Sequence, residues 1–228
     1  MKKVVVLTGA GMSAESGLQT FRGSDGLWEG HDIMEVASPM GWENDKELVL
    51  DFYNKRRAQL LQVSPNPGHL ALVTLEKMFE VEIITQNVDD LHERAGSKNV
   101  LHLHGELLKV RSTKNSNLIY DWRKDLKLGD VCEENGQLRP HIVWFGEEVP
   151  MLQQAAEITL KADILLVIGT SMKVYPAANL INYTKPDIPI YFIDPEPSIR
   201  QDQYSNLKIV AENASTGVTK VVNELARL

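Results

Sequence analysis

Cysteine is nearly absent from this chain, because Cys132 is the one thiol among 228 residues. A lone cysteine forms no intramolecular disulfide, and it supplies too few thiolates for a zinc site built from several cysteines. Such scarcity is typical of proteins in a reducing compartment. We therefore expect a cytoplasmic location.

Long hydrophobic runs are also missing. The longest, Ile164–Ile168, has the length of a strand and falls far short of the ~18 residues that a membrane span needs. The apolar run Val4–Leu7 follows two lysines but stops at Thr8, short of the ~7 to 15 apolar residues of a signal peptide. We expect this run to be a β-strand and the protein to carry no membrane segment.

Positive charge is in deficit: 24 Lys and Arg stand against 31 Asp and Glu, so the net charge is -7 and the pI is about 5.4. Such a chain should be repelled by polyanions, so we expect neither nucleic acid nor membrane as a partner. With 43% apolar and 24% charged residues, the composition is that of an ordinary globular protein. The length predicts one large domain, or one domain carrying insertions.

Short apolar runs recur along the chain, each leading into a helix-like segment. They do not alternate with polar residues, which is typical of parallel strands covered on both faces. The predicted strands are Val4–Leu7, Val81–Thr85, Val100–Leu103, Ile164–Gly169, Ile190–Ile193 and Leu207–Val210. The predicted helices are Pro67–Met78 with Asn66 as N-cap, Val88–Ala95 ended by Gly96, Leu152–Ala162, Tyr175–Tyr183, and Ser215–Leu228 with Ser215 as cap. This order predicts a doubly wound α/β fold that binds ligands at the carboxyl ends of its strands.

Two segments interrupt the alternation. Residues 18–64 contain no good strand but include a helix-like segment, Lys46–Val63. Residues 106–143 mix β-prone pieces with turn chemistry, which predicts a small hairpin-rich module. Because both segments follow predicted strands, we expect them to form a lobe that faces the ligand edge of the sheet.

A glycine-rich turn follows the first predicted strand. Its sequence Gly9-Ala10-Gly11-Met12-Ser13-Ala14 fits the dinucleotide fingerprint G-x-G-x-x-G/A in the correct context. The alternative is a tight strand-to-helix turn without a ligand. About 20 residues on, where an ordinary dehydrogenase has a second strand and a ribose-binding acid, residues 21–28 have loop chemistry instead.

The chain resembles the sirtuins, the NAD-dependent protein deacylases, in a series of motifs. The first runs from Gly9 through Gly17 to Phe21-Arg22; the others are Thr85-Gln86-Asn87-Val88-Asp89-Asp90-Leu91-His92, His102-Leu103-His104-Gly105, Val143-Trp144-Phe145-Gly146-Glu147, Gly169-Thr170-Ser171 and Val174-Tyr175-Pro176-Ala177. They occur in family order over nearly the whole chain. The resemblance implies a Rossmann-type large domain over residues 1–20, 65–105 and 144–228, and a small domain over residues 21–64 and 106–143, with NAD and the acyl-lysine in the cleft between them.

His104 follows a predicted strand and precedes a glycine, with His102 two residues earlier on the same face. The spacing alone does not distinguish a catalytic role from two other possibilities: a pair of hydrogen-bonded core histidines, or an H-x-H pair that binds a metal. The resemblance implies that His104 is the general base that takes a proton from a ribose hydroxyl of NAD, a role that suits a pKa near ~6.5. It also implies that the acyl oxygen attacks the nicotinamide ribose, releasing nicotinamide, and that the products are free lysine and O-acyl-ADP-ribose.

The resemblance likewise implies the NAD-binding residues. Asn87 and Asp89 shape the nicotinamide pocket and count with His104 as catalytic, although the polar residues after this strand are equally suited to cap the next helix. The full expected set is Gly9, Ala10, Gly11, Ser13, Ala14, Gly17, Phe21, Arg22, Trp28, Gln86, Asn87, Asp89, Gly169, Thr170, Ser171, Asp194, Pro195, Glu196 and Ala214. Asp194 stands where family members often have asparagine.

Tyr53 and Arg56 lie three residues apart on one predicted helix and share a face. Their ordinary interpretation is an exposed tyrosine in a basic patch with Lys55 and Arg57. By resemblance, Tyr-x-x-Arg here marks the subclass that removes acidic acyl groups such as succinyl or malonyl, because a guanidinium binds a carboxylate bidentately. The resemblance further implies that Val143, Trp144, Phe145 and Gly146 bind the substrate peptide as an added strand.

The chain departs from the family at its zinc site. Ser112 stands at the first expected cysteine position, and Asn135 replaces the partner of Cys132. We therefore expect no zinc, a buried Cys132, and a small domain held by Leu118, Ile119, Trp122, Leu126, Leu128 and Leu138.

The expected function is that of a monomeric NAD-dependent deacylase acting on succinyl-, malonyl- and acetyl-lysine of proteins. Two alternatives remain open from the sequence: a Rossmann-type oxidoreductase, which would reduce the nicotinamide ring, and a noncatalytic NAD or ADP-ribose sensor, which would bind the nucleotide without consuming it.

Overall fold

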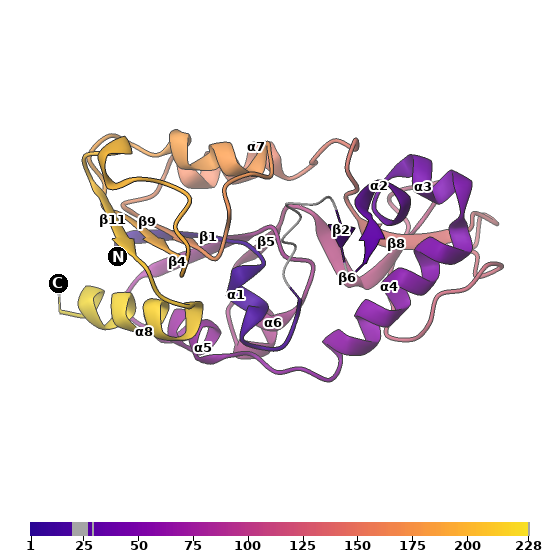
Figure 1. Cartoon of the computed structure of the whole chain (residues 1–228), viewed down its shortest axis with the longest axis horizontal. Helices are drawn as coiled ribbons and strands as arrows, with labels where there is room; N and C mark the ends of the chain where they lie inside the picture. Colours follow the sequence, from indigo (N-terminus) through magenta and orange to yellow (C-terminus); the bar gives the residue numbers. More distant parts are fainter. Residues whose placement is uncertain (20–26, 29, 228) are drawn as a thin grey trace.

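The apolar runs form a six-stranded parallel sheet in the order β11-β10-β9-β1-β4-β5 (Figure 1). The computed structural model describes residues 1–19, 27, 28 and 30–227. The strands are β1 (Lys3–Thr8), β4 (Glu80–Thr85), β5 (Val100–His102), β9 (Ile164–Ile168), β10 (Ile190–Ile193) and β11 (Leu207–Val210). Each lies within a residue or so of its predicted range, which confirms the parallel α/β fold.

Both faces of this sheet are covered, which explains the unbroken apolar runs of its central strands: Val4–Leu7 in β1 and the whole of β9 and β10. Val4 and Val6 of β1 pack in a core with α5 (Pro67–Leu75) and α8 (Ala214–Leu225). Val5 and Leu7 point to the opposite face, where α7 (Leu152–Thr159) and the 3₁₀ helix η1 (Ala177–Tyr183) pack. Successive side chains of a strand alternate between faces, so a strand buried on both sides needs an apolar residue at every position.

The first turns of the helices follow local hydrogen-bonding chemistry. The Asn66 side chain accepts from the N–H groups of Gly68 and His69, which confirms the predicted cap of α5. Gly96, with φ 110°, ends α6 (Leu91–Ala95) as predicted. The predicted cap at Ser215 is wrong, because Asn213 occupies the N-cap of α8 and the Ser215 N–H donates to Glu15.

Several predicted helices are too long. The segment from Val88 becomes helical only at Leu91, because the preceding polar groups are bonded within the loop: the Asp89 carboxylate accepts from the Leu91 N–H. The segment from Tyr175 is a 3₁₀ helix that begins at Ala177. The predicted ends at Met78, Ala162, Val63 and Leu228 are also late, since the corresponding helices end at Leu75, Thr159, Leu60 and Leu225.

The two interrupting segments pack together beside the sheet, at the right of Figure 1. The first supplies the short antiparallel pair β2 (Leu27–Trp28) and β3 (His31–Asp32), then α2 (Ile33–Val36), α3 (Pro39–Asn44) and α4 (Lys46–Leu60). The second forms an antiparallel sheet in the order β7-β6-β8, from β6 (Gly105–Ser112), β7 (Ile119–Asp121) and β8 (Leu138–Ile142). The exact residue limits of the two domains stay a prediction.

The core of this smaller part differs in two places from the predicted set. Leu126 and Leu138 are buried, and Leu118 and Trp122 pack at the edge of the core. Ile119 and Leu128 are 42% and 48% exposed, so their predicted role is wrong. On β7 the inward position belongs to Tyr120, and the period of two turns Ile119 outward.

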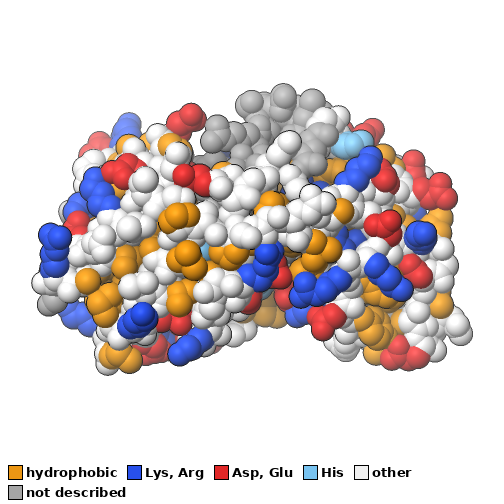
Figure 2. Space-filling model, turned by 90° about the horizontal axis from the view of Figure 1, so that it is seen from below, with side chains coloured by type: hydrophobic (Ala, Val, Ile, Leu, Met, Phe, Trp, Pro, Cys, Tyr) orange, Lys and Arg blue, Asp and Glu red, His pale blue; other side chains and the backbone are white. Residues whose placement is uncertain are grey.

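The surface face in Figure 2 carries Lys and Arg side chains interspersed with Asp and Glu, and its outline is indented between the two parts of the molecule. Within the described ranges, no helix combines the length and the apolar character that crossing a membrane requires.

Candidate active site

The carboxyl ends of β1 and β9 meet where the sheet order reverses, since the chain continues from β1 toward β4 and from β9 toward β10. Such switch points form the ligand crevice of doubly wound sheets. Here the Gly11 N–H donates to the Gly169 carbonyl at 2.8 Å. A Cβ on Gly9 would lie 2.7 Å from the Gly169 oxygen, and one on Gly11 would lie 2.7 Å from Gly169 Cα. The fingerprint glycines therefore let the two loops touch and expose bare backbone at the crevice.

A cleft of about 310 Å³ opens from this crevice toward the smaller part of the molecule. It brings together most of the predicted site residues: Gly9, Ala10, Gly11, Ser13, Trp28, Tyr53, Arg56, Gln86, Asn87, Asp89, His104, Val143, Trp144, Phe145, Gly146, Gly169, Thr170, Ser171 and Asp194. Five others do not line it, namely Ala14, Gly17, Pro195, Glu196 and Ala214. Phe21 and Arg22 lie outside the described residues.

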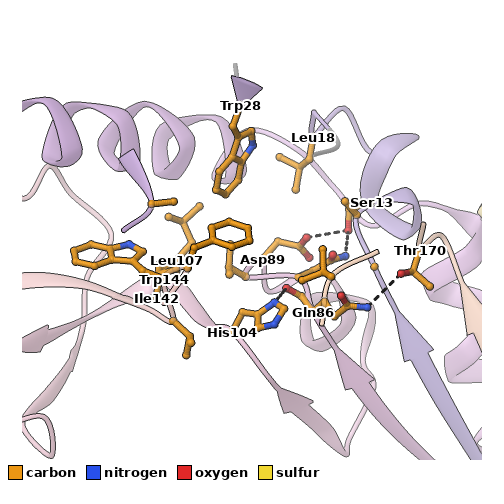
Figure 3. A pocket seen from close by; sticks show the side chains of 18 of the residues that line it. Ser13, Leu18, Trp28, Gln86, Asp89, His104, Leu107, Ile142, Trp144 and Thr170 are labelled. Carbon is orange, nitrogen blue, oxygen red and sulfur yellow. Dashed lines mark hydrogen bonds between the residues drawn. The ribbon is translucent and has the colours of Figure 1, made fainter. Parts of the chain in front are cut away.

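His104 lines the cleft two residues after the end of β5. Its Nδ1 is 3.1 Å from the Gln86 carbonyl oxygen (Figure 3). Because a carbonyl only accepts hydrogen bonds, Nδ1 carries the proton and Nε2 keeps its lone pair. Burial lowers the pKa of His104, and the bond to Gln86 opposes this in part. The imidazole is therefore neutral at physiological pH and able to accept a proton at Nε2.

A chain of hydrogen bonds joins the loop after β4 to the glycine-rich turn. The Asn87 amide donates to the Ser13 hydroxyl at 3.1 Å, and that hydroxyl donates to the Asp89 carboxylate at 2.9 Å (Figure 3). Burial raises the pKa of Asp89, while the bonds from Ser13 and the Leu91 N–H oppose the rise. The N-cap of α6 is Asp90, which makes no side-chain cap bond, but the carboxylate of Asp89 accepts from the first helical N–H, that of Leu91, and also lines the cleft.

Gln86 bridges the cleft toward the other loop. Its amide lies 3.4 Å from the Thr170 hydroxyl, a weak contact that ties the end of β4 to the loop after β9 (Figure 3). Farther along the sheet edge, the Asp194 carboxylate accepts from the Glu196 N–H at 2.8 Å. Asp194 lines the cleft, whereas Pro195 and Glu196 do not.

Helix α4 presents Tyr53 and Arg56 to the cleft. Tyr53 is 0% exposed, its hydroxyl accepts from the indole N–H of Trp144 at 3.0 Å, and burial raises its pKa. The guanidinium of Arg56 lies 4.2 Å from the centroid of the Trp28 ring, a cation–π distance. The aromatic ring and the helix together hold the cation at the cleft wall.

The interpretation of this helix as an exposed basic patch is wrong. Arg57 is 1% exposed, and it donates to the Leu107 carbonyl and to Asn54, which ties α4 to β6. Burial lowers the pKa of Arg57 to about 10. Lys55 alone of these neighbours is solvent-exposed, in an ion pair with Asp51.

The segment from Val143 to Gly146 lines the cleft next to α4 and is tightly held. The Val143 N–H donates to the His104 carbonyl, and the Phe145 N–H donates to the Ala37 carbonyl, both at 2.9 Å. The Trp144 N–H donates to the Glu147 carboxylate at 2.8 Å. Glu147 is itself held by the guanidinium groups of Arg139 and Arg111.

Sequence reasoning missed the apolar residues of the cleft. Leu107 of β6, Ile142 of β8, and Leu18 and Val88 in loops line it next to the predicted residues (Figure 3). In the sequence these leucines and isoleucines are indistinguishable from core residues, because the pattern shows which face of a strand is apolar but not what that face meets.

Cys132 is buried as expected, and its thiol donates to the Ser112 hydroxyl at 3.1 Å. The Gly136 N–H lies 3.3 Å from the same sulfur. Across the part of the chain that the structure describes, no group of three or more His, Cys, Asp or Glu side chains is arranged to hold a metal ion.

Comparison with known proteins agrees with this geometry. The Sir2 family model matches residues 9–176. An NAD-dependent protein deacylase of Helicobacter pylori (strain J99) is 56% identical over 229 residues, which cover 100% of this chain and 97% of that protein. Its counterpart in Bacteroides thetaiotaomicron is 49% identical over 227 residues, covering 97% of each.

Solved structures give the same result. A mutant Sir2 homologue in complex with ADP-ribose aligns with TM-score 0.90 and 38% identity, covering 99% of this chain and 92% of that one. A Sir2 homologue in complex with NAD aligns with TM-score 0.87 and 37% identity, covering 99% and 90%. With a family model over most of its length and relatives of this similarity over its whole length, the chain belongs to the Sir2 (sirtuin) family.

Proposed function

We propose that this protein is an NAD-dependent protein-lysine deacylase that removes succinyl, malonyl and acetyl groups and yields nicotinamide, O-acyl-ADP-ribose and free lysine. The observation that carries the proposal is the convergence in one cleft of a neutral histidine, the Asn87–Asp89 loop and the buried cation Arg56. The relatives named as deacylases and the solved Sir2 complexes support it.

The residues present fit NAD. Gly9, Gly11 and Gly169 leave backbone without side chains at the crevice, as the close approach of a pyrophosphate requires. The Asn87 amide and the Asp89 carboxylate supply a donor and an acceptor, which is what a nicotinamide carboxamide needs. When bound, NAD supplies the ribose carbon that accepts the acyl oxygen.

His104 is assigned as the general base. Its Nδ1–H donates to the Gln86 carbonyl, so the lone pair on Nε2 is the one that accepts the proton of a ribose hydroxyl. The lowered pKa of His104 keeps this nitrogen unprotonated at neutral pH. Asn87 and Asp89 are assigned to hold the nicotinamide end.

Arg56 and Tyr53 are assigned to acyl selection. A cation held at the wall of a cleft pairs with the distal carboxylate of a succinyl or malonyl group, and an acetyl group has no such partner. The apolar side chains of Leu107, Ile142 and Val88 border the same cleft and suit the methylene carbons of an acyl-lysine.

The substrate is assigned as an acylated lysine within a protein, lying along Val143–Gly146. The N–H groups of Val143, Trp144 and Phe145 already have partners inside the protein, so an added strand would draw on the carbonyl groups of this segment. A solved Sir2 complex holds a deacetylated peptide together with acetyl ADP-ribose. A monomer in the cytoplasm completes the proposal, with the domain limits given above.

Seven predicted residues either do not line the cleft or lie outside the described residues, and they stay assigned to NAD by resemblance. They are Ala14, Gly17, Phe21, Arg22, Pro195, Glu196 and Ala214. We further propose that no zinc is required, because hydrogen bonds among Ser112, Cys132 and Gly136 join the segments that thiolates would otherwise tie through a metal.

The deciding experiment incubates the protein with NAD and paired acetyl and succinyl peptides of one sequence, and measures free nicotinamide and deacylated peptide by chromatography. Equimolar nicotinamide and deacylated peptide are expected. Formation of reduced nicotinamide would favour an oxidoreductase. Binding of NAD without consumption would favour a sensor.

A further inference from the structure

His102 stands two residues before the proposed general base, on β5, but it does not line the cleft. Its side chain is 9% exposed. Its Nδ1 lies 3.0 Å from the backbone carbonyl oxygen of Asn87, and its Nε2 lies 2.8 Å from a carboxylate oxygen of Glu93 on α6. The proposed function gives this residue no role.

Both partners of His102 are pure acceptors. A carbonyl and a carboxylate cannot donate, so each ring nitrogen must carry a proton for both contacts to be hydrogen bonds. A neutral ring would place a lone pair against one of the two oxygens. The geometry therefore requires an imidazolium, in contrast to His104, which meets one such acceptor.

The surrounding charges agree with this state. Burial lowers the pKa of His102, but the hydrogen bond and charge of Glu93, helped by Glu106 on β6, outweigh it, so the pKa lies above its ordinary value. Burial would raise the pKa of Glu93, yet His102 holds it below its usual range. The other titratable groups coupled to His102 are Asp89, whose charge the cation favours, and His92, which burial keeps neutral.

The carbonyl that His102 holds belongs to a residue of the cleft. The Asn87 N–H donates to the Thr85 hydroxyl at 3.0 Å, and its amide donates to Ser13. His102 fixes the third polar group of Asn87, its carbonyl. With His104 bonded to the carbonyl of Gln86, the two histidines anchor consecutive peptide units of the loop.

We propose that His102 is a positioning residue: held as an imidazolium by Glu93, it anchors the carbonyl of Asn87 and so orients the amide of Asn87, and through Ser13 the carboxylate of Asp89, toward the nicotinamide of NAD. The inference rests on the proposed function, which assigns Asn87 and Asp89 to that end of the cofactor.

The protonation state is tested directly by nitrogen NMR of the imidazole rings in the full-length protein at neutral pH. Both ring nitrogens of His102 are expected to carry protons in the wild type. In Glu93→Gln, one nitrogen is expected to lose its proton, because the Gln amide donates to Nε2 while Nδ1–H still donates to Asn87. A singly protonated His102 in the wild type would overturn the proposed imidazolium, whatever reaction the protein catalyses.

The positioning role is tested by kinetics. In His102→Leu the KM for NAD is expected to rise about 10-fold or more while the KM for the peptide stays within about 3-fold, since the loss lies in the orientation of the nicotinamide end. Glu93→Gln keeps the Nδ1–H bond and is expected to leave the KM for NAD within about 3-fold of wild type. An unchanged KM for NAD in folded His102→Leu would overturn the proposal.

Leu101→Ala is the matched control, because it weakens the packing of the same strand on the apolar side. This variant is expected to lower Tm without raising the KM for NAD selectively. If its KM for NAD rises while its KM for the peptide does not, then loss of strand packing, rather than loss of the His102 hydrogen bond to Asn87, causes the effect seen in His102→Leu. If His102→Leu does not fold, His102→Gln, whose amide can donate to the Asn87 carbonyl, is expected to retain a KM for NAD between those of wild type and Asn87→Ala. A wild type that never releases nicotinamide would refute the proposed function, whereas the NMR result stands apart from that outcome.

Discussion

The indole N–H of Trp144 donates to the hydroxyl of Tyr53 at 3.0 Å, and both side chains are buried. This bond joins α4, which carries Arg56, to the segment proposed to bind the peptide. The guanidinium of Arg139 lies over the face of the Trp144 ring, 3.3 Å from its centroid. The acyl-selecting helix and the peptide-binding segment are therefore one packed unit.

Replacement of Tyr53 by Phe removes the acceptor of this bond and leaves a buried indole N–H unpaired, which costs about 1 to 3 kcal/mol. We expect a lower Tm by differential scanning fluorimetry, together with a loss of desuccinylation smaller than that in Arg56→Met. An equal loss on acetyl and succinyl peptides would show that Tyr53 acts through Trp144 rather than on the acyl group.

Arg56→Met tests acyl selection. A charge-assisted bond to the distal carboxylate is worth about 1.5 to 3 kcal/mol, so we expect kcat/KM for succinyl peptide to fall roughly 10- to 150-fold, mainly through KM, with deacetylation within a few-fold. The control is Lys55→Met, which removes the same charge from the exposed side of the helix. Parallel losses on both substrates would withdraw the acidic-acyl assignment.

His104→Ala should keep the fold but lose about 10²- to 10⁴-fold in kcat, the usual contribution of a positioned general base. NAD binding, followed by calorimetry, should persist. Near-normal turnover in this variant would remove His104 from the mechanism.

The pH profile of kcat/KM tests the same residue in the wild type. The active form of His104 is the neutral one, and burial lowers its pKa below 6.5. The acid limb of the profile should therefore have its midpoint below pH 6.5, with more than half of the activity retained at pH 6.5. A midpoint above 6.5 would contradict a neutral, desolvated base.

Acid should destabilise the protein through His69, which is 0% exposed and whose pKa burial lowers to about 4. The unfolded chain binds this proton near pH 6.5, so stability is complete above pH 6.5 and falls between 6.5 and 4. By pH 5 this residue alone should cost about 2 kcal/mol. Urea unfolding of wild type and His69→Gln at pH 7.5 and 5 should show a smaller acid loss in the variant; equal losses would exclude His69 as the cause.

Zinc content tests the interpretation of Ser112 and Cys132. Elemental analysis of the purified protein should find no stoichiometric zinc, and a chelator should leave Tm unchanged, because a single thiolate holds a structural zinc too weakly. About one zinc per chain would contradict this expectation.

The features that local rules decide were predictable from the sequence. The unbroken apolar run Val4–Leu7 in β1 indicates a strand buried on both faces, and Asn66-Pro67 indicates a helix start, because both depend on neighbours in the chain. Gly9 and Gly11 were identifiable for the same reason, since close backbone approach admits no Cβ.

Residues whose state depends on distant partners were not predictable in this way. Arg57 looked solvated yet is buried, because the carbonyl of Leu107, 50 positions away, receives it. His102 and His104 share one spacing motif, but the pKa of His102 lies above and that of His104 below the ordinary value, because Glu93 is bonded to the His102 ring whereas, among the described residues, the His104 ring is bonded to the Gln86 carbonyl.

The sequence by itself determined the parallel α/β fold, the family and most residues of the cleft, because periodicity, caps and glycine turns act within a few residues. Only the tertiary structure decided that Tyr53 is bonded to Trp144, that Leu107 and Ile142 line the cleft, and that Ala14, Gly17 and Ala214 lie off it. Burial and pKa depend on the whole surrounding volume, and that volume is filled by segments far apart in the chain.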